Sequence, residues 1–174
     1  MSLLFQPLNI GTLNLANRIV IAPMCQYSAV DGTAQDWHLI HLGHLALSGA
    51  GMMIIEATAV SPKGRITPGC LGLYSDENEK ALGRVIDAVR QHSDMPITIQ
   101  IGHAGRKGSS EAPWNGGSQI APDADKGWKA EAPSALPHAS GEDAPLALDA
   151  SPCRGYAARS ICGSTGQLHR GAVS

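Results

Sequence analysis

An alternation of strand-like and helix-like segments constrains the fold of this chain more than any other feature. Three apolar segments rich in Ile, Val and Met, at residues 18–21, 52–55 and 96–101, are typical of buried strands. Two segments with helical periodicity separate them, at residues 37–48 and 76–90. Helices that alternate with strands in this way indicate parallel βαβ units. The sequence therefore predicts an α/β fold with a parallel sheet.

Local signals mark where the two predicted helices begin and end. The first helix carries apolar residues on one face and ends at Gly49-Ala50-Gly51. The second opens at Asp76, because the carboxylates of Asp76 and Glu79 have the spacing of a capping box. Its inner face consists of Leu82, Val85, Ile86 and Val89.

The two flanks of this α/β region have a different character. Residues 3–18 alternate apolar and polar positions around Asn9-Ile10-Gly11-Thr12, which predicts a short hairpin. From residue 109 onward the sequence is rich in Gly, Pro, Ala, Asp and Ser, which predicts a long loop. Within it, residues 143–149 are expected to lead into the next helix.

Composition excludes several classes of function. The chain is 43% hydrophobic and 16% charged, with a net charge of -2, so it is typical of a globular protein. Its longest basic cluster is the pair Arg106-Lys107, which argues against nucleic-acid binding. No secretory signal and no run of about 18 apolar residues occurs. We therefore expect a cytoplasmic protein whose partners are small molecules or other protein chains, with no nucleic-acid or membrane partner.

Four motifs at the predicted strand ends carry the functional information. They are Ala22-Pro23-Met24-Cys25-Gln26-Tyr27, Glu56-Ala57-Thr58-Ala59-Val60, Gly64-Arg65-Ile66-Thr67-Pro68-Gly69 and Gln100-Ile101-Gly102-His103-Ala104-Gly105-Arg106-Lys107. Together they closely resemble the N-terminal half of the old yellow enzyme family, in its cysteine-containing, xenobiotic-reductase-like branch. The resemblance implies NADH:flavin oxidoreductase activity of the ene-reductase type, and full-length relatives that are homo-oligomers.

The same resemblance implies the N-terminal half of a (β/α)8 TIM barrel that is truncated. A complete barrel needs roughly 250 residues, whereas this chain has 174. We assign residues 1–137 to the half barrel that binds FMN. Residues 138–174 are assigned to a tail outside the family, disordered or out of frame, because residues 151–174 show no helical or strand period. Our specific hypothesis is that the reading frame is lost near Asp149 or Ala150.

The resemblance also assigns the site. Pro23, Met24 and Cys25 line the flavin after the first strand, Ala57 contacts it after the second, and Gln100 reaches its pyrimidine edge after the third. Cys25 tunes the electronics of FMN. The hydroxyl of Tyr27 binds the oxygen of a substrate stacked on the flavin. NADPH or NADH reduces FMN, which then reduces activated alkenes such as α,β-unsaturated carbonyls or nitro compounds.

Each of these residues also has an alternative interpretation. Cys25 can be a buried packing thiol, and Tyr27 a half-buried aromatic residue at a strand end. The pattern around Arg65 fits a solvated surface residue as well as it fits a functional one. His103 fits a packing or hydrogen-bonding residue better than a catalytic one. His38, His41 and His44 fan over roughly 120° of a helix, which is too wide for one metal ion, so we expect no metal site.

Two alternatives for the whole chain also follow from the sequence. The family binds the substrate oxyanion with a histidine pair and a tyrosine after its fourth strand, and holds the FMN phosphate with later residues. None of these motifs matches this sequence. The chain is therefore either a flavin enzyme or a noncatalytic fragment with exposed strand edges. A half barrel that dimerises is a third, less favoured possibility.

Overall fold

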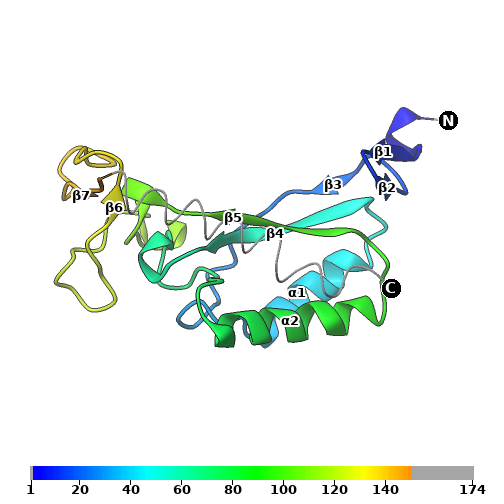
Figure 1. Cartoon of the computed structure of the whole chain (residues 1–174), viewed down its shortest axis with the longest axis horizontal. Helices are drawn as coiled ribbons and strands as arrows, with labels where there is room; N and C mark the ends of the chain where they lie inside the picture. Colours follow the sequence, from blue (N-terminus) through cyan, green and yellow to red (C-terminus); the bar gives the residue numbers. More distant parts are fainter. Residues whose placement is uncertain (1, 150–174) are drawn as a thin grey trace.

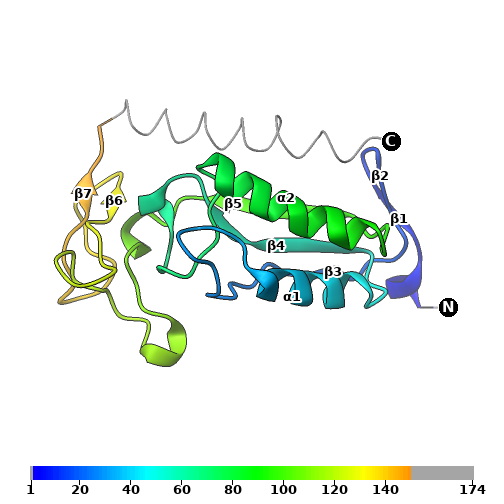
Figure 2. The same cartoon turned by 90° about the horizontal axis from the view of Figure 1, so that it is seen from below.

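The computed structural model describes residues 2–149 and contains the predicted βαβαβ order. Three parallel strands form one sheet in the order β3-β4-β5, and two helices cover one face of it (Figure 1 and Figure 2). The elements are β3 (Val20–Ile21), α1 (Asp36–Ala46), β4 (Met52–Ala59), α2 (Asp76–Arg90) and β5 (Ile97–Gly102). The predicted α/β fold with a parallel sheet is confirmed.

Strand β4 extends beyond the prediction because its second half is also paired. The sequence analysis ended this strand at residue 55, yet Thr58 and Ala59 pair with Ile101 and Gly102 of β5. A register shift between Ile55 and Thr58 interrupts the pairing. The apolar pattern does not predict this irregularity, because the strand continues beyond the polar residue Glu56, at which the apolar run ends.

The predicted hairpin is present at the N-terminus. It consists of β1 (Leu8–Ile10) and β2 (Leu13–Leu15), which pair antiparallel, with Gly11 at a φ of 58° in the turn. It follows a 3-10 helix at Leu3–Phe5. Figure 1 shows the hairpin beside the end of the sheet where β4 and β5 begin. The hairpin therefore lies opposite the strand ends that carry the functional motifs.

The core lies between the sheet and the two helices. Met53 and Ile55 of β4 face α1 and α2, because alternate side chains of a strand point to the same face. The helices meet this face with their own buried residues, which are Leu42, Ala46, Leu82, Val85 and Val89. Burying one such aliphatic side chain stabilises the fold by about 1.5–3 kcal/mol. This layer fixes the directions of the strands and hence the positions of their carboxyl ends.

The N-terminus of α2 differs from the prediction. Asp76 is the first helical residue rather than the cap, and the Oγ of Ser75 accepts a hydrogen bond from the Asn78 N–H at 3.2 Å. Ser75 has extended backbone angles, φ −140° and ψ 159°, which place its hydroxyl over the first turn. Asp76 and Glu79 instead lie in the first turn, where the helix dipole favours negative charge.

Replacing the capping serine by alanine is expected to lower the free energy of unfolding by about 1 kcal/mol, because one amide hydrogen loses its partner. Urea denaturation followed by circular dichroism would measure the loss in Ser75→Ala. The matched variant is Asp76→Ala, which removes the residue that the sequence analysis placed at the cap. A larger loss in Asp76→Ala than in Ser75→Ala would overturn the assignment of the cap.

The long loop, predicted from residue 109 onward, begins earlier, directly after β5, and contains a few short elements up to residue 149. These are 3-10 helices at Gly105–Lys107 and Pro113–Asn115 and the parallel pair of β6 (Glu131–Ala132) and β7 (Leu146–Ala147). Figure 1 shows this region at the end of the sheet where β4 and β5 stop. The stretch 143–149, expected to lead into a helix, contains β7.

The predicted domain boundary at residue 137 stays a prediction. Backbone hydrogen bonds cross it, from the Leu146 N–H to the Ala130 carbonyl at 2.8 Å and from the Leu148 N–H to the Ala132 carbonyl at 2.9 Å. Most of the predicted tail, and with it the hypothesis of a lost reading frame, lies outside the described residues. Within residues 2–149, no helix is both long enough and apolar enough to cross a membrane.

Candidate functional site

The structure brings Ala57 and Gln100 together at the carboxyl end of the sheet. Both lie inside strands, in β4 and β5, rather than after them as the sequence analysis expected. They line a cavity of about 270 Å³ that also contacts Cys70 and His103. Much of the remaining lining is small, with Ala59, Gly64, Gly102 and Ala104. The cavity is therefore lined mainly by small and apolar residues, with the polar side chains of Gln100, Arg65 and His103 among them.

The Pro23, Met24 and Cys25 segment does not line this cavity. Met24 is exposed and borders a separate crevice of about 10 Å³ on the α1 side of the sheet, together with His38 and Glu56. Cys25 is half-buried and reaches the cavity through its contact with Cys70. Of the residues expected to contact the flavin, Ala57 and Gln100 therefore line the cavity, and Cys25 lies next to Cys70, which lines it.

Cys25 and Cys70 lie close enough for each thiol to shift the pKa of the other. The contact with Cys25, together with two hydrogen bonds from Thr67, lowers the pKa of Cys70 to about 6. The Thr67 N–H and Oγ1 both lie 3.4 Å from the Cys70 Sγ. The same contact with Cys70, together with burial, raises the pKa of Cys25. Cys70, which Thr67 contacts with two polar groups, is therefore the thiol of this pair that is better placed to lose its proton.

Glu56 fixes the loop that carries Cys25 and Tyr27. It is 4% exposed in the middle of β4, and its Oε2 accepts a hydrogen bond from the Gln26 N–H at 3.0 Å. Its Oε1 lies 3.4 Å from the Nε2 of buried His38, a polar contact without the geometry of a hydrogen bond. Because the His38 Nδ1 accepts from the Gln35 N–H at 2.9 Å, the ring hydrogen of neutral His38 is on Nε2.

The three histidines of α1 do not converge. His38 is buried against Glu56, His41 stacks on Trp37 with ring centroids 6.4 Å apart, and His44 is exposed. Burial is the main reason that the pKa of His41 is lowered. Among residues 2–149, no cluster of three or more histidine, cysteine or carboxylate side chains has a geometry suited to a metal ion.

Tyr27 lies over a second hollow on the loop side of the site. Its φ of 54° is unusual for a residue with a side chain, and its ring meets Trp114 edge to face at 5.0 Å. Both line a hollow of about 560 Å³ together with Arg65 and Lys126. Burial raises the pKa of the Tyr27 phenol, so the group stays protonated and can donate a hydrogen bond at neutral pH.

Arg65 and His103 have structural contacts. Arg65 donates to the carbonyls of Pro62 and Pro68, at 3.0 and 3.2 Å, and its guanidinium lies 5.3 Å from the Trp128 ring. The His103 Nδ1 accepts from the Gly105 N–H at 3.0 Å, and burial lowers the pKa of its imidazole. His103 is therefore held neutral at the wall of the 270 Å³ cavity.

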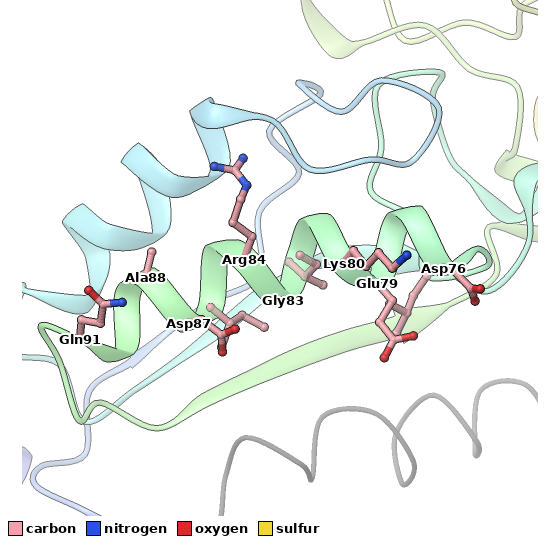
Figure 3. Close-up of a pocket in the computed structure, with 11 residues that line it drawn as sticks. Asp76, Glu79, Lys80, Gly83, Arg84, Asp87, Ala88 and Gln91 are labelled. Carbon is pink, nitrogen blue, oxygen red and sulfur yellow. The ribbon is translucent and has the colours of Figure 1, made fainter.

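A third hollow, of about 930 Å³, lies along α2 and away from the strand ends. Its charged residues project from successive turns of the helix rather than converging, as Figure 3 shows for Asp76, Glu79 and Asp87. Arg84 points the other way, toward α1, where it contacts Asp36 at 3.1 Å. This hollow therefore lacks the arrangement of groups that a catalytic site requires.

Sequence reasoning missed Cys70 and Glu56. Cys70 follows the recognised Gly64–Gly69 motif directly, so its position beside that motif was the available signal. Glu56 follows four apolar residues in β4 and is buried. A buried carboxylate requires a hydrogen-bond donor or a positive charge nearby. Neither signal identifies the partner in the sequence.

The chain is similar in sequence to known flavin oxidoreductases. A model of the NADH:flavin oxidoreductase / NADH oxidase family matches residues 3–141. An NADH:flavin oxidoreductase of Gibberella zeae is 42% identical over 139 residues, which are 79% of this chain and 33% of that protein. An NADPH dehydrogenase of Bacillus subtilis is 41% identical over 110 residues, which are 62% of this chain and 32% of that protein. The chain thus spans about a third of the length of these curated relatives.

Solved structures show the same likeness. Morphinone reductase superposes with a TM-score of 0.74 at 26% identity, covering 96% of this chain and 45% of that chain. The old yellow enzyme of Trypanosoma cruzi superposes with a TM-score of 0.73 at 27% identity, covering 98% of this chain and 48% of that chain.

Proposed function

The chain belongs to the NADH:flavin oxidoreductase / NADH oxidase family, and from this membership we propose that its strand ends form the ring-binding part of an FMN site for hydride transfer. The cavity shared by Ala57 and Gln100 is the observation that carries the proposal. It lies at the carboxyl ends of parallel strands, where barrel enzymes of this type bind their ligands.

The resemblance to old yellow enzymes and the expected fold class are confirmed. The solved neighbours are TIM barrels, and this chain covers about 45% of them. Truncation itself stays a prediction. FMN and NAD(P)H, the cofactors expected from the sequence, are those of the family to which the chain belongs.

The cavity fits part of FMN. Small-molecule pockets measure about 300–1,000 Å³, so 270 Å³ is sufficient for part of a flavin ring but not for a whole cofactor. Phosphates in such barrels are held by loops after strands seven and eight. The described residues include three barrel strands, so we assign them the ring and not the phosphate.

We assign roles to the chain's own residues on this basis. The Gln100 amide donates and accepts hydrogen bonds at the polar edge of the ring, and the small side chain of Ala57 leaves room for the ring. Cys25 places its thiol beside the site, and its raised pKa keeps this thiol protonated. Tyr27 donates its phenolic hydrogen to a substrate oxygen. FMN, when bound, supplies the transfer of hydride between the nicotinamide and the substrate.

The substrates that we propose are activated alkenes, namely α,β-unsaturated carbonyl and nitro compounds. The polar oxygen of such a substrate suits the protonated Tyr27, and its planar body suits the aromatic wall that Tyr27 forms with Trp114. The reductant is NADPH or NADH, since the curated relatives include proteins named for each.

A second candidate, a noncatalytic fragment, is favoured by the edges of the sheet. Within residues 2–149, β3 and β5 each pair on one side only, with β4. Unpaired strand edges recruit further strands or cause aggregation. Gel filtration separates this candidate, which predicts aggregates or complexes, from a half barrel that forms a defined dimer.

The test of the proposed function is whether the purified chain retains FMN after incubation and desalting. Retention of the visible absorption of oxidised flavin is expected if the ring site suffices for binding. A colourless but folded protein would contradict the proposal and favour the fragment.

Gln100→Ala provides the residue-level test. Loss of one hydrogen bond of about 0.5–1.5 kcal/mol predicts a roughly two- to tenfold weaker affinity for FMN, measured by flavin fluorescence. Gln91→Ala is the matched control, because Gln91 is an exposed glutamine beyond the end of α2. Equal affinities in both variants would remove Gln100 from the site.

A further inference from the structure

Two loops that are distant in sequence hold Cys25 and Cys70 side by side. The Ala29 N–H donates to the Gly69 carbonyl at 2.9 Å, so the residues after Cys25 are bonded to the residue before Cys70. Gly69 also packs so closely against Tyr27 that a Cβ at this position would lie 2.5 Å from the Tyr27 carbonyl oxygen. Both thiols are free, and neither lies in a helix or strand.

We propose that Cys25 and Cys70 form a reversible disulfide when the protein meets a peroxide. The proposed function assigns a role to Cys25 but none to Cys70. It does not require that the chain bind FMN.

The chemistry follows from the roles of the two thiols. The Cys70 thiolate attacks one oxygen of hydrogen peroxide, the O–O bond breaks, and hydroxide leaves, so Cys70 becomes a sulfenic acid. The Cys25 thiol then attacks the Cys70 sulfur, the S–O bond breaks, and water leaves. In sum, the two thiols lose two protons and two electrons, and one peroxide becomes two waters.

The cavity gives the oxidant access to a buried sulfur. Cys70 is only 1% exposed, yet it lines the cavity of about 270 Å³. A water molecule occupies roughly 30 Å³ of liquid, so a molecule as small as hydrogen peroxide fits this space with room to spare. The hydrogen bonds from Thr67 stabilise the thiolate that reacts.

The disulfide would change the site. Once oxidised, Cys25 no longer carries a hydrogen to donate, and its loop is tied covalently to the loop of Cys70. A disulfide requires the two sulfur atoms to approach to about 2.05 Å, and neither cysteine lies in a helix or strand that would oppose this movement.

Peptide mapping of the full chain tests the proposal. Trypsin places Cys25 in peptide 19–63, Cys70 in 66–80, Cys153 in 130–154 and Cys162 in 160–170, so each cysteine has its own peptide. After hydrogen peroxide treatment of the folded protein, blocking of free thiols and digestion, we expect peptides 19–63 and 66–80 linked with the loss of two hydrogens. Dithiothreitol should restore the separate peptides.

Controls separate this pair from chance oxidation. The double variant Cys153→Ser/Cys162→Ser should form the same link, whereas Cys70→Ser should not. Peroxide treatment in urea should link the four cysteines without preference. The proposal is overturned if the folded protein keeps peptides 19–63 and 66–80 separate, if Cys25 is found over-oxidised alone, or if the links run to Cys153 or Cys162.

Discussion

Replacing Glu56 by alanine is expected to lower the free energy of unfolding by about 2–5 kcal/mol, because it removes the partner of the buried His38 and of the half-buried Gln26 amide. The Gln26 N–H would lose its acceptor, and the His38 Nε2 would lose the carboxylate that it faces. An unsatisfied buried polar group costs about 1–3 kcal/mol, and Glu56 itself is 4% exposed, so its deletion also leaves a void. Urea denaturation of the variant measures the total.

The effect on the site is expected to accompany the effect on stability. The bond between Glu56 and Gln26 holds the backbone between Cys25 and Tyr27. Its loss should increase the rate at which a small alkylating reagent modifies Cys25 under native conditions. Peptide 19–63 reports this modification, since Cys25 is its single cysteine.

Two control variants separate the loss of the Glu56 hydrogen bond from the loss of its charge, and a buried contact from an exposed one. Glu56→Gln keeps an oxygen acceptor for the Gln26 N–H and should lose less stability than Glu56→Ala. Arg84→Ala breaks the pair with Asp36, whose side chain is 85% exposed, and should cost less than about 1 kcal/mol. A loss at Arg84→Ala that equals the loss at Glu56→Ala would show that the buried contacts of Glu56 have no special weight.

Gly69→Ala is expected to lower the free energy of unfolding by about 1–3 kcal/mol through crowding of the backbone. An added Cβ would lie 2.5 Å from the carbonyl oxygen and 2.8 Å from the carbonyl carbon of Tyr27. Backbone atoms cannot rotate away as a side chain can, so the two loops must separate. The separation should also break the hydrogen bond from the Ala29 N–H and weaken the pairing of Cys25 with Cys70.

Gly83→Ala is the matched control for the same chemical change. Gly83 lies inside α2, and an added Cβ there would meet no atom within 4 Å. Alanine in a helix interior is favoured over glycine, so this variant should gain about 0.5–1 kcal/mol. Thermal unfolding of both variants checks the opposite signs. Equal shifts in the two variants would contradict the close packing of Gly69 against Tyr27.

The two helices show how far local sequence signals reach. The apolar spacing correctly places α1 and α2, because a helix that packs against one face of a sheet buries one stripe of its residues. The cap of α2 escapes the same reasoning. Ser75 and Asp76 are both good capping residues, and the extended backbone at Ser75 decides between them.

The candidate site shows a similar division. The motifs at positions 22–27, 56–60, 64–69 and 100–107 are readable as strand ends, and the parallel order places them at one edge of the sheet. The roles of Pro23, Met24, Cys25, Tyr27, Ala57 and Gln100 stay predictions. The structure adds that Ala57 and Gln100 share a cavity, whereas Met24 borders another crevice.

The sequence by itself determined the order of strands and helices, the parallel sheet and the family, because these follow from hydrophobic periodicity and from motifs that are contiguous along the chain. The tertiary structure alone decided which side chains meet. Cys25 pairs with Cys70, and Glu56 with Gln26 and His38, across separations that no local pattern encodes. These contacts depend on the directions in which the packed helices and strands deliver the loops, and that is a property of the whole core.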